Sequence, residues 1–372
     1  MGEVIGHGAG LVVAVTGGAG FIGSAVCRRL ARRPGYRVVN IDKLTYAGNL
    51  SNVADVSGSG GYVFYRNDIC DGAAMLDIMR RENVGTVLHL AAETHVDRSI
   101  DGAAPFIQSN IVGTFSLLEA TRTYWSELPA DRRGAFRFVQ VSTDEVYGAL
   151  GPDDAAFHEG SPYNPSSPYS ASKAAADHLA RSWHRTYGLP VILTNCSNNY
   201  GPYHFPEKLI PLTILNALEG RPLPIYGEGK NIRDWLHVDD HAEALEIILR
   251  RGRPGEKYNI GGNAERSNIA TVRAICRAID ALRPLPDGSR HEGLITFVDD
   301  RPGHDFRYAI DSSYLAGALG WTASRSFEEG IHDTVQWYLD NENWWWPIRE
   351  GGDATRRRGR LGQAQAVADV WP

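Results

Sequence analysis

Cysteine is scarce in this chain. The 372 residues contain four, Cys27, Cys70, Cys196 and Cys276, and no two of them form a Cys-x-x-Cys pair. A chain of this length can bury a large hydrophobic core without disulfide staples. We therefore expect reduced thiols, no metal site, and a protein of the cytoplasm.

Long hydrophobic runs and excess positive charge are also missing. Residues 1–10 are glycine-rich without a basic segment, and the apolar stretch Leu11–Val15 has the length of a strand, too short for a signal peptide or a membrane span. The net charge is −6, which argues against a general nucleic-acid binder. Any anionic ligand must therefore meet local positive charge. We expect neither membrane nor nucleic acid as a partner.

Short apolar runs alternate with helical patterns through the first half of the chain. This alternation predicts an α/β fold: a Rossmann-type, doubly wound parallel sheet with helices on both faces. The expected helices lie near 21–33, 72–82, 103–125 and 168–186. The expected strands are Leu11–Thr16, Arg37–Ile41, Tyr62–Tyr65, Thr86–Leu90, Arg137–Ser142 and Val191–Asn195.

Proline and glycine become dense after about residue 197, which predicts a smaller C-terminal substrate-binding lobe. One further strand-like run, Glu256–Ile260, follows a helical pattern near 238–251 and is expected to rejoin the main sheet. Further helices are expected near 268–283, 312–319 and 327–341. The predicted division is a Rossmann domain over 1–197 with a returning segment near 236–262, a lobe over 198–235 and 263–345, and a tail over 346–372. The tail, with Arg356, Arg357, Arg358 and Arg360, is interpreted as a solvated end.

A glycine-rich segment follows the first strand and opens the first helix. In VTGGAGFIGS, glycines 17, 20 and 23 permit a tight turn and a close approach of the backbone to a pyrophosphate at the helix N-terminus. Asp42 stands 19 residues after Gly23, at the end of the second strand. A carboxylate there accepts hydrogen bonds from a ribose diol and repels a 2′-phosphate, so the pattern favours NAD over NADP.

Tyr169 and Lys173 are four residues apart and share one face of a predicted helix. A phenol is a poor base near pH 7, and a neighbouring ammonium is expected to lower its pKa. Lys173 could also hold the nicotinamide ribose. Thr143, at the end of the fifth strand, supplies a hydroxyl group. Short-chain dehydrogenases use such a trio to move a carbinol proton.

Two adjacent acids, Asp144 and Glu145, follow Thr143 in VSTDEVYG. Ligands bind at the carboxyl edge of an open parallel sheet, and carboxylates placed there are costly unless they are paired or functional. One acid and one base near the same carbon atoms can eliminate water. The pair therefore predicts a dehydration, where a simple dehydrogenase would need only the trio.

At these residues the chain resembles the dTDP-glucose 4,6-dehydratase family of extended short-chain dehydrogenases/reductases. The resemblance runs from about Leu11 to about Leu339. It is carried by the strings VTGGAGFIGS, NIDKLTYAGN, HLAAETHVDRSI, VSTDEVYG, SPYSASKAAADH, TNCSNNYGPYHFPEKLIP, LPIYGEGKNIRDWLHVDDH, YNIGG and DRPGHD.

The resemblance implies a lyase that keeps its NAD⁺ through the catalytic cycle. Tyr169 would take the proton of the glucose 4-hydroxyl during C4 oxidation, with Thr143 bonded to the 4-oxygen. Glu145 would remove the C5 proton, Asp144 would protonate the departing 6-hydroxyl, and hydride would return to C6 while Glu145 returns a proton to C5. The product would be dTDP-4-keto-6-deoxy-D-glucose. This order is required because only the 4-ketone makes the C5 hydrogen acidic.

The resemblance also implies a set of cofactor contacts. Ser109 stands where the family usually has threonine, so the hydroxyl is retained. Asp68 has a second interpretation as the cap of the next helix. The implied positions are Gly17, Gly20, Phe21, Ile22, Gly23, Asp42, Lys43, Leu44, Thr45, Asp68, Ile69, Ala91, Ala92, Thr94, Ser109, Tyr169, Lys173 and Asn199.

On the substrate side, cations must meet the donor's pyrophosphate, and arginine suits this because its guanidinium pairs two oxygens. Arg233 could instead pair with Asp234, Tyr226 could stack on a pyrimidine or serve packing, and His95 could contact substrate or line the strand exit. The implied substrate residues are His95, Thr143, Asn198, Lys208, Leu209, Pro224, Tyr226, Arg233, Asn268, Arg301 and His304.

The chain departs from the family pattern after about Leu339. Many relatives place a tyrosine against the nucleotide there, whereas this chain has three tryptophans, Trp344–Trp346, which cannot share one helix face. We expect some of them to pack on the lobe or at a subunit edge. Family members are usually dimers joined by a four-helix bundle, which the helices near 103–125 and 168–186 would form.

Three alternatives remain open on the sequence. The same dehydration could act on a UDP- or GDP-sugar. A related epimerase or decarboxylase would share the glycine loop and the Tyr169/Lys173 pair but would not need Asp144 and Glu145. A non-catalytic NAD(H)-binding sensor would have lost one of these groups.

Overall fold

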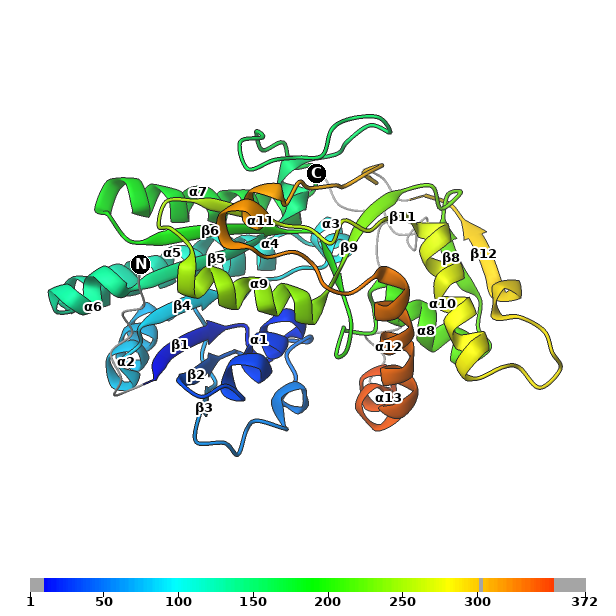
Figure 1. Ribbon diagram of the computed structural model, residues 1–372, viewed down its shortest axis with the longest axis horizontal. Coiled ribbons are helices and arrows are strands. Elements are labelled where there is room, and N and C mark those ends of the chain that lie inside the picture. The colour runs from blue at the N-terminus through cyan, green and yellow to red at the C-terminus, as the bar shows by residue number, and fades with distance from the viewer. Residues whose placement is uncertain (1–9, 301–303, 351–372) are drawn as a thin grey trace, which may run out of the picture.

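The structure is a computed structural model that describes residues 10–300 and 304–350. Figure 1 shows a larger α/β unit on the left and a smaller unit on the right. The larger unit is built on a parallel sheet, and the smaller one carries helices and short strands from the second half of the chain. The two units meet where the strands of the large sheet end.

The central sheet has seven strands in the order β10-β6-β5-β4-β1-β2-β3, and every neighbouring pair is parallel. The strand order reverses between β1 and β4, which is where an open α/β sheet places its ligand crevice. This confirms the predicted fold class. The strands are β1 (Leu11–Thr16), β2 (Tyr36–Ile41), β3 (Tyr62–Tyr65), β4 (Thr86–His89), β5 (Arg137–Thr143), β6 (Val191–Cys196) and β10 (Lys257–Ile260).

Helices cover both faces of this sheet and complete two hydrophobic cores. On one face the core joins the strands to α1 (Phe21–Ala31), α9 (Val238–Arg251) and α11 (Ser313–Leu319). On the other face it joins them to α2 (Gly72–Glu82), α5 (Thr114–Glu127) and α7 (Pro168–Tyr187). The strands are buried on both sides, which explains why their sequences are continuous apolar runs.

The helix predicted over 103–125 is not α-helical throughout. It consists of α4 (Ala104–Phe106), a π-helical segment Ile107–Gly113 and then α5. Within the wide turn, the Asn110 side chain accepts a hydrogen bond from Glu93 N at 2.8 Å and donates to Glu93 O at 3.0 Å. The π segment therefore fixes the backbone that leaves β4, a use of π-helical turns that is frequent near functional sites.

The smaller unit has its own hydrophobic core between helices and short strands. Its strands have three to six residues, too few for hydrophobic periodicity to predict them. Its elements are β7 (Asn198–Tyr200), α8 (Leu209–Leu218), β8 (Leu223–Tyr226), β9 (Ile232–His237), β11 (Glu265–Ser267), α10 (Asn268–Leu282), η4 (His291–Leu294), β12 (Ile295–Val298), α12 (Phe327–Asp340) and α13 (Glu342–Glu350). The remaining short elements are η1 (Leu50–Val53), α3 (Val96–Asp101), α6 (Ala130–Ala135) and η3 (Asp144–Tyr147).

The three consecutive tryptophans lie on α13. Trp344 and Trp345 are buried in the core of the smaller unit, whereas Trp346 is 44% exposed. Packing on the lobe is thus confirmed for two of them. The helix also continues past residue 345, where the lobe was predicted to end. The arginines predicted to form a solvated end, Arg356–Arg358 and Arg360, lie outside the described residues.

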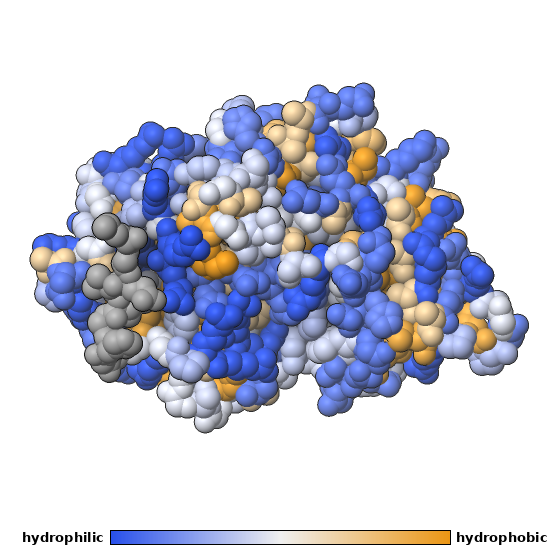
Figure 2. Space-filling model, in the orientation of Figure 1, coloured by the Kyte–Doolittle hydropathy of each residue, from blue (hydrophilic) through white to orange (hydrophobic). Residues whose placement is uncertain are grey.

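The face seen in Figure 2 is largely hydrophilic, with small separate apolar patches. Within the described part of the chain, no helix combines the length and apolar character that crossing a membrane requires. All four cysteines are free thiols, and Cys27, Cys196 and Cys276 are buried.

His89, the last residue of β4, gives the fold a specific dependence on pH. Its ring nitrogens are 2.7 Å from Thr16 Oγ1 and 3.0 Å from Thr114 Oγ1. Burial, with a smaller contribution from Lys173, lowers the pKa of His89 from 6.5 to about 3. Below about pH 6.5 the histidine is protonated in the unfolded chain but stays neutral in the folded chain. The free energy of unfolding therefore decreases as the pH falls.

We therefore expect the destabilisation caused by His89→Gln to be smaller at pH 5 than at pH 7.5, by about 2 kcal/mol. The reason is that protonation of His89 stabilises the unfolded wild type at pH 5, whereas glutamine does not titrate. Urea unfolding of both proteins at the two pH values measures this difference. An equal loss of unfolding free energy at both pH values would contradict the assignment.

Candidate active site

A cavity of about 550 Å³ lies at the carboxyl edge of the central sheet and is lined by residues of both units. Among the described residues predicted for the site, all but three line it. The exceptions are Leu44, Asp68 and Asp144, which lie beside lining residues. Arg301 lies outside the described residues. The structure thus brings the predicted glycine loop, catalytic trio and lobe residues to one place.

The glycine loop has the shape of a cradle for a phosphate group. Gly17 has φ +73°, and a Cβ there would lie 2.7 Å from Ala91 N. A Cβ on Gly23 would lie 2.1 Å from Gly17 O, so only glycine allows α1 to pack against the turn. Gly20 caps α1 without a side-chain hydrogen bond, which leaves the first turn able to bind an anion. These residues fit the pyrophosphate of a dinucleotide.

The loop after β2 is organised by Asp42. Its carboxylate accepts hydrogen bonds from Ala19 N at 3.0 Å and Leu44 N at 2.8 Å, and Leu44 has a positive φ of 59°. Burial raises the pKa of Asp42. The carboxylate therefore joins the glycine loop to the β2 loop at the position expected to face an adenosine ribose.

Asp68 does not cap the following helix, which settles one open alternative. Asp71 is the cap of α2 and accepts from Ala74 N at 3.0 Å. Asp68 instead lies 3.3 Å from Lys43 Nζ, which also lies 3.3 Å from Ser109 Oγ. The lysine thus connects the ends of β2 and β3 to the π segment.

Tyr169 and Lys173 lie in the first two turns of α7. Ser167 forms a capping box with Ser170 and Pro168 occupies the first turn, so this helix begins at one defined position. The Lys173 ammonium donates to Val141 O at 2.8 Å. Tyr169 is buried, hydrogen-bonds to the Thr143 side chain, and contacts the edge of Phe106.

The pKa of Tyr169 departs from the sequence-based expectation. Burial, and next the charge of Glu145, raise the pKa of this phenol well above its usual value, although the hydrogen bond with Thr143 opposes them. Burial also lowers the pKa of Lys173. The expected lowering of the Tyr169 pKa was therefore wrong for the protein alone, because burial and the charge of Glu145 dominate its surroundings.

The two acids at the end of β5 have different surroundings. Asp144 is 1% exposed, and burial followed by the charges of Glu145 and Asp234 raises its pKa well above the usual value. One of its oxygens is 3.3 Å from Thr143 Oγ1, while the other has no hydrogen-bond partner among the described residues. Glu145 lines the cavity, and its backbone N–H donates to Thr143 Oγ1 at 3.2 Å. The two adjacent carboxyl groups therefore differ in their surroundings, and the pKa of the buried one is raised.

Behind this group, a buried carboxylate was missed by sequence reasoning. Asp177 follows Lys173 by one further helical turn, is 1% exposed, and accepts a hydrogen bond from Tyr163 OH at 3.1 Å. Burial raises the pKa of Asp177, and Lys173 opposes this. The i, i+4, i+8 spacing of Tyr169, Lys173 and Asp177 on one helix face could have revealed it.

The lobe places its predicted residues on the opposite wall. Arg233 donates to Ile232 O at 2.7 Å and Asp305 O at 3.1 Å and lies over the Tyr308 ring. The predicted alternative partner, Asp234, instead accepts from two backbone N–H groups. The Tyr226 ring meets His304 edge to face with centroids 5.8 Å apart, and the His304 ring nitrogen lies 2.6 Å from Asp300.

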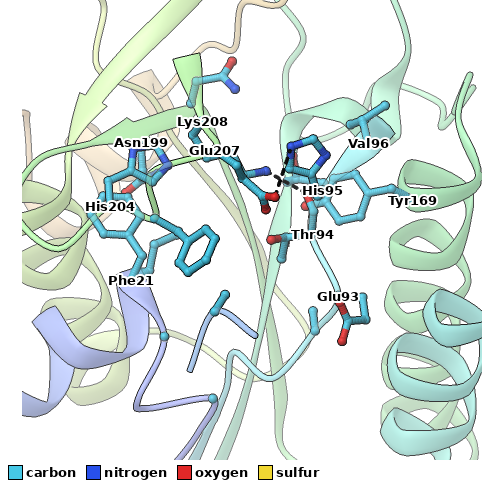
Figure 3. Close-up of a pocket in the computed structure, with 18 of the residues that line it drawn as sticks. Phe21, Glu93, Thr94, His95, Val96, Tyr169, Asn199, His204, Glu207 and Lys208 are labelled. Carbon is cyan, nitrogen blue, oxygen red and sulfur yellow. Dashed lines mark hydrogen bonds and ion pairs between the residues drawn. The ribbon is translucent and has the colours of Figure 1, made fainter. Parts of the chain in front are cut away.

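Two residues at the cavity mouth, His204 and Glu207, line the cavity but were not predicted from the sequence. Figure 3 shows Glu207 and Lys208 facing His95 and Thr94, with His204 beside Phe21. His95 caps α3 and lies 3.8 Å from Glu207. His204 and Glu207 lie in the string HFPEK. The spacing of this string does not indicate a contact with the other unit, so only the fold reveals these pairs.

The comparisons with known proteins agree with this geometry. The family model described as GDP-mannose 4,6 dehydratase matches residues 14–334. A dTDP-glucose 4,6-dehydratase of Neisseria meningitidis is 57% identical over 349 residues, covering 93% of this chain and 98% of the relative. A dTDP-glucose 4,6-dehydratase of Escherichia coli is 55% identical over 357 residues, covering 93% of this chain and 99% of the relative.

Solved structures of nucleotide-sugar enzymes are also similar to this chain. The dTDP-glucose 4,6-dehydratase of Streptomyces venezuelae, solved with NAD bound, superposes with a TM-score of 0.82 at 42% identity, covering 91% of this chain and 100% of that one. A UDP-glucose 4-epimerase of Thermus thermophilus has a TM-score of 0.77 at 29% identity, covering 89% and 100%. Relatives above 50% identity over nearly the whole chain carry one name. The chain therefore belongs to the dTDP-glucose 4,6-dehydratase family.

Proposed function

We propose that this chain is an NAD-dependent hydro-lyase that converts dTDP-D-glucose to dTDP-4-keto-6-deoxy-D-glucose and water. The observation that carries the proposal is that Glu145, Thr143, Tyr169 and Lys173 line one cavity with the glycine loop, while Asp144 lies directly behind them beside Thr143. The relatives named dTDP-glucose 4,6-dehydratase, at 55–57% identity, support the donor nucleotide.

The glycine loop and Asp42 would hold the cofactor, with Lys43 and Ser109 at its adenosine end and Lys173 at its nicotinamide end. When bound, NAD⁺ would supply the reversible two-electron chemistry that oxidises C4 and later reduces C6. The clash distances at Gly17 and Gly23 support this placement, because a side chain at either position would collide with the backbone that forms the cradle.

Tyr169 would take the proton of the 4-hydroxyl. Burial raises its pKa in the protein alone, and the positive charge that bound NAD⁺ would bring to the site opposes that rise. The hydrogen bond from Thr143 favours the phenolate, and Lys173 stands one helical turn away. Thr143 would then hold the 4-oxygen as it becomes a ketone.

Glu145 would remove the C5 proton once C4 is a ketone, and Asp144 would donate a proton to the departing 6-hydroxyl. The raised pKa of Asp144 supports its role as the acid, since burial favours the protonated carboxyl group, which is the form that can donate. Glu145 would afterwards return a proton to C5. Arg233 and Lys208 would meet the donor's pyrophosphate, and Tyr226 with His304 would lie near its base.

Product analysis with three donors tests the proposal. The purified protein is incubated with dTDP-, UDP- and GDP-glucose in deuterated water, and each product is examined by NMR. We expect a 4-keto-6-deoxy product with deuterium at C5, formed fastest from dTDP-glucose. Preference for a UDP- or GDP-sugar would move the proposal to that donor, and no turnover of any glucose donor would refute it.

We also propose a homodimer of the cytoplasm, joined through the helices over 104–127 and 168–187. Large apolar side chains are exposed on these helices, including Ile107, Phe115 and Tyr187 at 45%, 46% and 47%. A four-helix bundle would bury them. The free thiols suit a reducing compartment. Sedimentation at micromolar concentration as a monomer would refute the dimer.

A further inference from the structure

A segment of the lobe crosses the mouth of the cavity and touches three loops of the Rossmann unit. We call residues Tyr203–Lys208 the strap. Tyr203 has a positive φ of 66°, so the chain turns sharply where the strap begins. His204, Phe205, Glu207 and Lys208 line the cavity together with the glycine loop.

The strap meets each loop through a different contact. His204 stacks on Phe21 of the glycine loop, with centroids 4.2 Å apart and planes 13° apart (Figure 3). Phe205 meets the ring of Tyr46, in the loop after β2, edge to face at 5.4 Å.

The C-terminal end of the strap, at Glu207 and Lys208, is bound by an ion pair and a hydrogen bond. Arg98, on α3 after β4, donates from Nε and Nη2 to Glu207 at 3.1 and 3.0 Å, and its guanidinium also covers Tyr46 at 3.7 Å. Lys208 donates to Thr94 O at 3.1 Å. The Glu207 side chain is 7% exposed and that of Arg98 14%, so this ion pair is shielded from solvent.

The strap therefore closes over the segment that would bind a pyrophosphate. The glycine loop and the loops after β2 and β4 are the three loops that surround a dinucleotide in this fold. The stack of Phe21 and His204 joins the strap directly to the glycine loop that would cradle the ligand.

Trp344 anchors the base of the strap from outside. Tyr203 packs among Trp337, at 4.6 Å, and Trp344, at 5.5 Å, and the Arg28 guanidinium covers its ring. Tyr338 OH donates to His204 O. The start of the strap is thus seated in an aromatic cluster of α12 and α13.

The same tryptophan also reaches the glycine loop. Its indole N–H donates to Asn52 Oδ1 at 2.8 Å, and Asn52 Nδ2 donates to Ala19 O at 2.9 Å. Arg28 Nη1 donates to Asn52 O at 2.6 Å. Trp344 and Asn52 are buried, at 9% and 1% exposed, so this chain of bonds is protected from water. Trp344 therefore contacts the start of the strap directly and the glycine loop through Asn52.

We infer that Trp344 is a positioning residue that ties the strap to the glycine loop and thereby slows release of the bound dinucleotide. The inference rests on the cofactor binding of the proposed function. It gives the tryptophan segment a role: an enzyme that must reduce the same sugar it oxidised gains from a cofactor that stays bound through turnover.

The test measures release of the cofactor. Wild type, Trp344→Phe, Trp344→Ala and Trp346→Ala are loaded with radiolabelled NAD⁺, chased with excess unlabelled NAD⁺, and sampled over time. Trp344→Phe keeps the ring and loses the bond to Asn52, so release should be about threefold to tenfold faster. Trp344→Ala should be faster still. Trp346→Ala, whose side chain is 44% exposed, should release at the wild-type rate.

Activity separates positioning from general damage. With saturating NAD⁺ in the assay, kcat of Trp344→Phe should return to within about twofold of wild type. If Trp344→Ala does not fold, Glu207→Gln tests the other end of the strap and should also speed release. Wild-type release rates in Trp344→Phe and Glu207→Gln would overturn the inference. A wild-type protein that neither contains nor binds NAD⁺ would instead refute the proposed function.

Discussion

Replacing Glu145 by glutamine is expected to stop the reaction after the first oxidation. The amide keeps the shape of the side chain but cannot accept the C5 proton, so kcat for dehydration should fall by about 10²- to 10⁴-fold. Tyr169, Thr143 and Lys173 remain intact, so C4 oxidation should continue. Addition of dTDP-glucose should therefore produce reduced cofactor that persists on the enzyme, visible by its near-ultraviolet absorbance.

The matched control is Glu243→Gln on α9. Glu243 is 39% exposed in a salt bridge with Arg29 and lies outside the cavity, so its loss should leave kcat unchanged. Dehydration by Glu145→Gln at the normal rate would show that another group takes the C5 proton. Loss of both oxidation and dehydration would show that Glu145 is needed earlier than proposed.

Replacing Tyr169 by phenylalanine is expected to abolish both the C4 oxidation and the dehydration that follows it. The ring can still pack against Phe106, and only the hydroxyl bonded to Thr143 is lost. No group would then accept the 4-hydroxyl proton, so kcat/KM should fall by about 10²- to 10⁴-fold. In contrast to Glu145→Gln, no reduced cofactor should form when dTDP-glucose is added.

Tyr314→Phe serves as the control for the loss of a phenol. Tyr314 is 38% exposed on α11 and does not line the cavity, so the variant should behave as the wild type. Rapid formation of reduced cofactor by Tyr169→Phe would mean that Thr143 or Lys173 takes the carbinol proton. The two variants therefore separate the base that acts at C4 from the base that acts at C5.

The sequence predicted the central sheet well because its strands and helices have strong local signals. Strands buried on both faces show as continuous apolar runs, and α7 begins at a proline preceded by a serine cap. The short strands of the lobe have no comparable signal. A helix near 103–125 was predicted, but its π segment was not, since the Asn110 side chain in that segment bonds to Glu93, which lies in a loop 17 residues away.

At the site, the sequence identified residues whose spacing along the chain reflects their chemistry, such as the glycine loop and the Asp144–Glu145 pair. It missed what depends on long-range packing. The bond from Trp344 to Asn52 joins residues 292 positions apart, and no local pattern indicates it. The predicted direction of the shift in the Tyr169 pKa was also wrong, because the burial of the phenol cannot be inferred from the spacing of residues on a helix.

The central claim is that the cofactor oxidises and reduces the same sugar molecule. Its most direct test uses dTDP-glucose deuterated at C4, mixed with unlabelled donor that carries heavy carbon, with mass spectrometry of the 4-keto-6-deoxy products. We expect the deuterium at C6 of the molecules that first carried it at C4, with no transfer to the heavy-carbon product. Deuterium in the heavy-carbon product, in solvent or in free reduced cofactor would contradict the account.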